Sequence, residues 1–134
     1  MLEVTENPLS SSGLTEPVVL SYFESFNAEN FVATANLFDP NGELQPPFES
    51  AISGRESIAY YLHREARGMK LSPHHSRQTE LADNLLQIQI QGSVQTPFFS
   101  VNVAWQFVLS PAREILHLEV KLLASPEELL KLRR

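Results

Sequence analysis

Residues 85–109 are the part of the sequence that most constrains the fold, because apolar and polar side chains alternate along two successive runs. Alternation with a period of two over about ten residues is typical of an antiparallel β-strand with one buried face. The stretch therefore predicts two long strands whose apolar face needs a cover. That face carries Leu86, Ile88, Ile90, Gly92, Val94 and Thr96 in the first run, and Phe99, Val101, Val103, Trp105 and Phe107 in the second.

A third long strand is predicted from Glu114 to Leu123, and a short joint separates the first two strands. Pro97 lies at that joint, where the missing backbone N–H of proline does least harm to a sheet. The third strand repeats the alternation, so its apolar side chains are expected on the same covered face. They are Leu116, Leu118, Val120 and Leu122.

The segments before these strands carry the helical period. After Thr15, a predicted N-cap, and Pro17, apolar side chains recur at i, i+3, i+4 and i+7. A second, short helix is predicted over Glu29–Phe38. Together these elements supply the cover that the strands need. The apolar stripe of the first helix is Val19, Tyr22, Phe23 and Phe26.

A third helix is predicted to begin at Ser53, because Ser53 and Glu56 have the spacing of a capping box. It is expected to stop at Gly68, and its apolar stripe is formed by Ile58, Tyr61 and Leu62. A short helix over Glu127–Leu132 is expected to close the chain.

Three proline-containing segments are expected to interrupt regular structure. Residues 39–42 (Asp-Pro-Asn-Gly) predict a turn. Residues 44–48 contain two prolines, so they are expected to be extended without forming a central strand. Residues 69–80 favour another strand, except that Pro73 breaks the pattern.

Length and composition favour one domain and narrow the classes of function. The chain has 134 residues, which we divide into a flexible arm (1–13) and a single domain (14–134). A net charge of −6 argues against a nucleic-acid partner. The sequence has no cysteine, no run of transmembrane length and no secretory pattern in its first residues, so a cytoplasmic protein without stable membrane insertion is expected.

Few polar residues lie at positions where they could form a metal site or a binding site. His74 and His75 are adjacent and so point to opposite faces of a strand, which predicts no metal site. Glu65 continues the apolar stripe of the third helix; it either reaches water at the helix end or offers its charge to a partner. Tyr22 either fills the core or aims its hydroxyl into a cavity.

Helices followed by long antiparallel strands predict an α+β fold, in which a curved sheet wraps around the N-terminal helices to form a cone. This order of elements resembles the nuclear transport factor 2-like superfamily, which contains both enzymes and binding proteins, so the fold does not decide the function. Asp39 and Asp83 are expected in turns, and His117 and Glu119 on the polar face of the last strand. No catalytic residue is therefore predicted inside the cone.

Five stretches of the chain resemble the C-terminal domain of the orange carotenoid proteins of cyanobacteria and its stand-alone homologues. The similarity covers nearly the whole chain from Val18 onward, and the LQPPF, VQTP, AWQF and LLASPEELL blocks are specific as a set. The helical domain of the full-length family members is absent from the sequence. The stretches are residues 19–23, 37–48, 94–97, 102–107 and 122–130.

The resemblance implies a non-enzymatic carrier of a ketocarotenoid of the canthaxanthin or echinenone type. Tyr22 and Trp105 match the family residues that donate hydrogen bonds to the carotenoid keto oxygen, and the polyene is expected to run past apolar side chains. Glu65 matches a position that pairs with an arginine of the helical domain. The block at the joint between the first two strands is expected to contribute further ligand contacts through Thr96, Pro97, Phe98 and Phe99.

The resemblance also implies a role in cyanobacterial photoprotection, in which the protein exchanges pigment with helical carotenoid proteins. A homodimer that encloses one pigment through the exposed face of its sheet is expected. The sequence departs from the family at Phe98, where a tryptophan is usual, in the shorter loop that follows, and in lacking the cysteine that can cross-link dimers. The alternatives are an isomerase- or dehydratase-type enzyme, favoured by an acid–base residue deep in the cavity, and a pigment-free dimerisation domain, favoured by a filled one.

Overall fold

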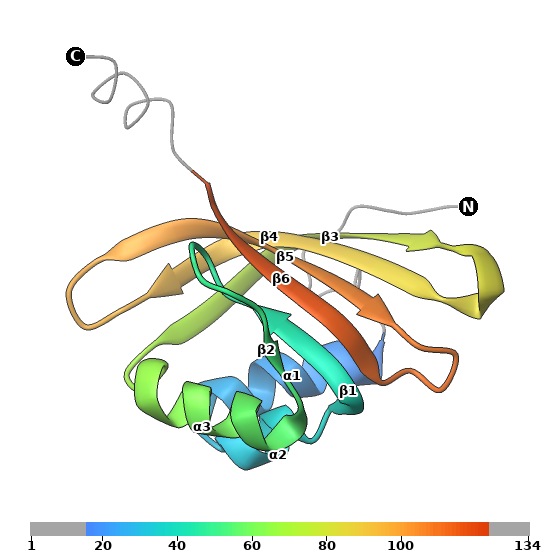
Figure 1. Ribbon diagram of the computed structural model, residues 1–134. Coiled ribbons are helices and arrows are strands. Elements are labelled where there is room, and N and C mark those ends of the chain that lie inside the picture. Colours follow the sequence, from blue (N-terminus) through green and yellow to red (C-terminus); the bar gives the residue numbers. More distant parts are fainter. Residues whose placement is uncertain (1–15, 124–134) are drawn as a thin grey trace.

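Our computed structural model describes residues 16–123 of the chain (Figure 1). The predicted arm (1–13) and the predicted helix Glu127–Leu132 lie outside these residues. Thr15 does too, and the N-cap of the first helix is Glu16, so the predicted cap at Thr15 was wrong. Short helices come first and long strands last. The elements are α1 (Pro17–Asn27), α2 (Phe31–Ala35), β1 (Phe38–Gln45), β2 (Ile52–Ser53), α3 (Arg55–Glu65), β3 (Lys70–Glu80), the 3₁₀ helix η1 (Ala82–Asn84), β4 (Leu86–Gln95), β5 (Ser100–Leu109) and β6 (Ile115–Leu123).

The described strands form one curved sheet in the order β2-β1-β6-β5-β4-β3, and the three α-helices lie on one side of it (Figure 1). Neighbouring strands are antiparallel except β1 and β6, which are parallel. This arrangement confirms the predicted α+β fold. The sequence does not predict the parallel pairing of β1 with β6, which places β1 beside the last strand of the chain.

The alternation along β4 and β5 places side chains as predicted. Ile90 is opposite Trp105 and Ile88 is opposite Phe107, and all four are buried. On the other face of the sheet, Gln89 donates a hydrogen bond to Gln106 across the same pair of strands, at 3.1 Å. These two strands therefore form the wall against which the helices pack.

The apolar face of β6 differs from the prediction near its start. Val108 pairs with His117 but Leu109 pairs with Ile115, so β6 has one extra residue there, a β-bulge. Ile115 is consequently fully buried, whereas Leu116, which was predicted on the buried face, is half-buried. The bulge shifts the period by one residue, after which Leu118 is again fully buried.

The predicted turn at residues 39–42 lies inside β1. The Asn41 backbone N–H donates to the Asp39 carboxylate at 2.8 Å, which is the local contact expected of an Asx turn. The pairing of β1 with β6 also shifts between Phe38 and Glu43. The turn residues therefore make a bulge in a strand and do not end it.

The prediction that residues 44–48 cannot belong to a central strand was wrong for the first two of them. Leu44 and Gln45 complete β1, which lies between β2 and β6. The prolines Pro46 and Pro47 follow directly after the last paired residue. They therefore cost the sheet no hydrogen bond.

Two helices begin or end elsewhere than predicted. The second helix ends at Ala35, because Phe38 already begins β1. The third helix has Gly54 as its N-cap, with a φ of 92°, and no side chain caps it, so the predicted capping box at Ser53 was wrong. Ser53 belongs to β2 instead, and glycine provides the backbone conformation that the entry into α3 requires.

Strand β3 continues through Pro73 and does not break there. Its pairing with β4 shifts between Pro73 and His75, and β3 is an edge strand, where a missing backbone donor is tolerated. Gly92 of β4 is opposite Pro73. A Cβ atom at Gly92 would lie only 2.2 Å from the carbonyl oxygen of Ser72, so the close approach of these strands depends on glycine.

Asn27, the last residue of α1, connects this helix to β3. Its side-chain amide donates to the Leu71 carbonyl at 2.9 Å, and its oxygen accepts from the Leu71 N–H at 2.8 Å. Replacing Asn27 with alanine leaves both backbone groups of a buried residue without partners, so we expect a loss of about 2 kcal/mol. Urea unfolding monitored by circular dichroism measures it. Asn27→Asp, which keeps only the acceptor, should lose less; equal stability of all three proteins would contradict the expected role.

Candidate functional site

An apolar cavity of about 320 Å³ lies between the helices and the inner face of the sheet. Its walls come from α1, α3, β1 and β3–β6, together with the segments that follow β1, α3 and β4. Most of the lining side chains are apolar. They are Tyr22, Phe26, Leu44, Pro46, Pro47, Glu49, Tyr61, Leu62, Glu65, Ala66, Met69, Leu71, Val94, Thr96, Phe99, Val101, Val103, Trp105, Val120 and Leu122.

Tyr22 and Trp105, the two predicted donors, line this cavity together. Tyr22 lies on α1 and Trp105 on β5, and each side chain is 2% exposed. Within residues 16–123, neither the Tyr22 hydroxyl nor the Trp105 indole N–H is hydrogen-bonded to the protein, and both residues line the cavity. Two neutral donors are thus available to one acceptor in an apolar site.

Aromatic neighbours fix the positions of both rings. The Phe23 ring meets Trp105 edge-on, with ring centroids 5.0 Å apart and planes at 85°. Phe107 meets Tyr22 in the same way, at 5.4 Å and 82°. Burial also raises the pKa of the Tyr22 hydroxyl well above its usual value of 10.0. Tyr22 is therefore a neutral donor at physiological pH.

The turn between β4 and β5 forms part of the cavity mouth. The Thr96 hydroxyl accepts from the N–H groups of Phe98 and Phe99, at 3.1 and 3.0 Å, and donates to the Phe99 carbonyl at 2.9 Å. Thr96 and Phe99 line the cavity, whereas Pro97 and Phe98 are not among the lining residues. Phe98 is 88% exposed. Ligand contact by these four residues stays a prediction.

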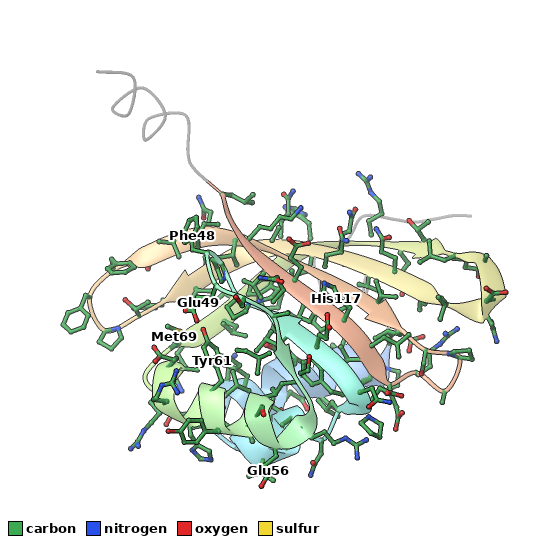
Figure 2. The ribbon with its side chains drawn as sticks, in the orientation of Figure 1. Phe48, Glu49, Glu56, Tyr61, Met69 and His117 are labelled. Carbon is green, nitrogen blue, oxygen red and sulfur yellow. The ribbon has the colours of Figure 1, made fainter. Side chains whose placement is uncertain are left out.

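The wall formed by α3 and the segment after β1 contains polar groups that sequence reasoning missed. Figure 2 shows Glu49, Tyr61 and Met69 close together there, and the Tyr61 hydroxyl donates to Glu49 Oε2 at 3.5 Å. Tyr61 was predicted on the apolar stripe of its helix, which was a usable signal for a cavity position. Glu49 follows two prolines in an irregular segment, and no pattern in the sequence indicates where it points.

Glu65, the predicted partner contact, also lines the cavity. Its carboxylate is paired with the adjacent Arg64 at 3.0 Å, and its side chain is 47% exposed. An exposed pair of this kind adds little to stability, so the carboxylate can exchange Arg64 for another cation. Pairing with a partner stays a prediction.

The stability contributed by Tyr61 is expected to depend on pH. Burial, followed by the carboxylates of Glu49 and Glu65, raises the Tyr61 pKa from 10.0 to about 12. Because the folded state holds this proton more tightly, its contribution is fully present below pH 10.0 and is lost as pH rises through about 12.

When the pH is raised from 9 to 11.5, we therefore expect the free energy of unfolding to fall less in Tyr61→Phe than in the wild type. Urea unfolding at the two pH values measures the difference, and Tyr60→Phe, at the exposed neighbouring position, is the matched control. Identical pH dependence in the wild type and Tyr61→Phe would contradict the assignment.

The site suits binding better than acid–base chemistry. Among the described lining residues the carboxylates are Glu49 and Glu65, whose residues are exposed, and no histidine or aspartate lines the cavity. The buried polar groups are the two neutral donors. The arrangement can hold an apolar molecule with a carbonyl group at one end. Within residues 16–123 no helix is long and apolar enough to cross a membrane.

Comparison with known proteins relates the chain to carotenoid proteins. No family model matches it. It is 38% identical over 130 residues to an orange carotenoid-binding protein of Synechocystis, covering 94% of this chain and 41% of the relative. It superposes on the orange carotenoid protein of Anabaena (Nostoc) binding canthaxanthin with a TM-score of 0.81 and 33% identity, covering 96% of this chain and 45% of that one.

A nuclear transport factor 2-like protein of Cytophaga hutchinsonii shares the fold with a TM-score of 0.65 at 18% identity, covering 89% of this chain and 97% of that one. The chain thus spans less than half of the carotenoid proteins it matches, and the matched part has this fold. The chain is a homologue of part of the orange carotenoid-binding proteins, their C-terminal, nuclear transport factor 2-like domain.

Proposed function

We propose that the protein is a non-enzymatic carrier of a ketocarotenoid, whose terminal carbonyl accepts hydrogen bonds from Tyr22 and Trp105. The observation that carries the proposal is the pair of buried donors in one apolar cavity, neither of which has a hydrogen-bond partner within residues 16–123. Leaving such groups unpaired costs free energy, which a carbonyl oxygen of the ligand would recover. The relative of known structure that binds canthaxanthin supports this class of pigment.

The size of the cavity indicates how much pigment one chain holds. At about 320 Å³ the cavity is near the lower end of the range for ligand pockets, about 300–1,000 Å³, and suits one end ring and not a whole polyene. The remainder of the pigment would extend past exposed apolar side chains near the mouth. These are Phe48, Phe98, Phe99 and Leu122.

A pigment that projects from the mouth needs a second cover. We propose that a second copy of the chain or a helical carotenoid protein supplies it, and that exchange between them serves photoprotection. Glu65, at the cavity wall, is the proposed contact for an arginine of the helical partner.

The other face of the sheet has a hollow of about 470 Å³ lined mainly by polar side chains such as Gln89 and Lys121. We propose this face as a second surface for the homodimer. Location in the cytoplasm stays a prediction.

The first experiment is to express the chain in a canthaxanthin-producing host and purify it by size exclusion with absorption detection. We expect pigment to co-elute with the protein, with an absorption maximum to the red of free canthaxanthin, at the volume of a dimer. A host without carotenoids is the control. A colourless protein from the pigmented host would overturn the carrier function, whereas a coloured monomer would overturn only the homodimer.

A further inference from the structure

We propose that Tyr61 and Glu49 form a second polar subsite of the cavity, which recognises a hydroxyl group on the ligand ring that carries the bound carbonyl. The inference rests on the proposed function and specifies the ligand further: a ring with a hydroxyl beside its ketone, in preference to a ketone alone. Nothing in the roles of Tyr22 and Trp105 requires this pair.

The geometry of the pair leaves room for a better hydrogen-bond partner. Both residues line the cavity, and their mutual hydrogen bond, at 3.5 Å, is at the limit of useful length. A phenol donates and accepts, whereas a carboxylate only accepts. A ligand hydroxyl can therefore accept from Tyr61 and donate to Glu49 at the same time, with both bonds shorter than the one they replace.

Neighbouring contacts hold both groups at the wall. The Gln45 side-chain amide donates to the Glu49 carbonyl oxygen, which ties the segment after β1 to the end of that strand. Tyr61 lies on α3, which is anchored in the core by Ile58 and Leu62. The Arg64 guanidinium lies 5.9 Å from the centre of the Tyr61 ring. The backbone positions of both residues are thus held at the wall by other contacts, which lowers the ordering cost of binding a ligand there.

The position of Tyr61 relative to Tyr22 decides which part of the ligand it can reach. Both phenols line the same cavity of about 320 Å³, which is small enough to bring one end ring of a ligand into reach of both. A ligand whose carbonyl is held at Tyr22 therefore has its adjacent ring atoms near Tyr61. A hydroxyl on the far ring of a long polyene would lie outside the cavity.

The expected preference is modest because the subsite is open to water on one side. A net hydrogen bond is worth a factor of about three to ten in affinity, so we expect the hydroxyketone to be favoured over the ketone by about that factor. The probes are astaxanthin, with a hydroxyl beside each carbonyl, and canthaxanthin, with the carbonyls alone. Apoprotein is incubated with both in excess at equal concentration, repurified and extracted, and the bound pigments are quantified by chromatography.

The matched variants are Tyr61→Phe, which removes the subsite hydroxyl, and Tyr60→Phe, which removes the hydroxyl of the adjacent tyrosine that does not line the cavity. We expect enrichment of astaxanthin by wild type and Tyr60→Phe, and a ratio near one for Tyr61→Phe. Binding of both pigments without enrichment by the wild type, or equal enrichment by all three proteins, would overturn the subsite and leave the proposed function intact. Failure to bind either pigment would overturn both.

Discussion

The double variant Tyr22→Phe/Trp105→Phe is expected to stay folded and to lose its affinity for canthaxanthin by a factor of about one hundred or more. Each substitution removes one donor, and together they leave the carbonyl oxygen buried without a partner. The loss of two hydrogen bonds and the burial of an unpaired acceptor sum to about 3 kcal/mol or more, which corresponds to that factor. Because Trp105 is the only tryptophan of the chain, the affinity is measured from the visible absorption of canthaxanthin titrated with each apoprotein, a signal that does not depend on protein fluorescence.

The control for this variant is a pigment of the same shape without a carbonyl group. β-Carotene cannot accept a hydrogen bond, so wild type and double variant should bind it within a few-fold of each other. Because Trp105 packs on Phe23 in the core, thermal unfolding must first confirm that the variant is folded at the titration temperature. Equal affinity of both proteins for canthaxanthin would show that these donors do not hold the pigment.

Replacing Gly92 with alanine is expected to lower the free energy of unfolding by about 3 kcal/mol and the melting temperature by about 10 °C. The added Cβ would lie 2.2 Å from the Ser72 carbonyl oxygen and 2.8 Å from Pro73 Cα. Both neighbours are backbone atoms of a paired strand, so they cannot rotate away as a side chain would. Relief of the clash would require β3 to move off β4.

The matched control is Gln91→Ala, one residue earlier on β4, where the side chain is exposed. Its effect should stay within about 0.5 kcal/mol, because it changes only a surface contact. Urea unfolding of the three proteins gives the comparison. Unchanged stability of Gly92→Ala would mean that β3 and β4 separate near Pro73 at little cost.

The sequence predicted the long strands well because the alternation of apolar and polar side chains is a local property of each strand. Ile88 and Phe107 are buried where the alternation places them. It did not predict that Ile115 replaces Leu116 on the buried face, because a bulge is defined by two strands and its position depends on the partner. The same holds for β1, where a strong turn signal at residues 39–42 is absorbed within a paired strand.

The candidate site was predictable in part. Tyr22 and Trp105 were singled out by their resemblance to a family, and the fold brings both to one cavity. Phe98 stands where the family usually has a tryptophan, and its side chain is exposed on a turn that Thr96 holds closed. Glu49 lines the cavity because β1 pairs with β6 and directs the following segment toward α3, a consequence of topology that local sequence does not carry.

The long outer strand β3 has a consequence for how the protein behaves in concentrated solution. An unpaired strand edge is a template for edge-to-edge aggregation. Here the edge carries Pro73, which cannot donate, and charged residues at Lys70, Arg77 and Glu80, while the shift after Pro73 distorts the ladder. These features discourage a second chain from extending the sheet at β3.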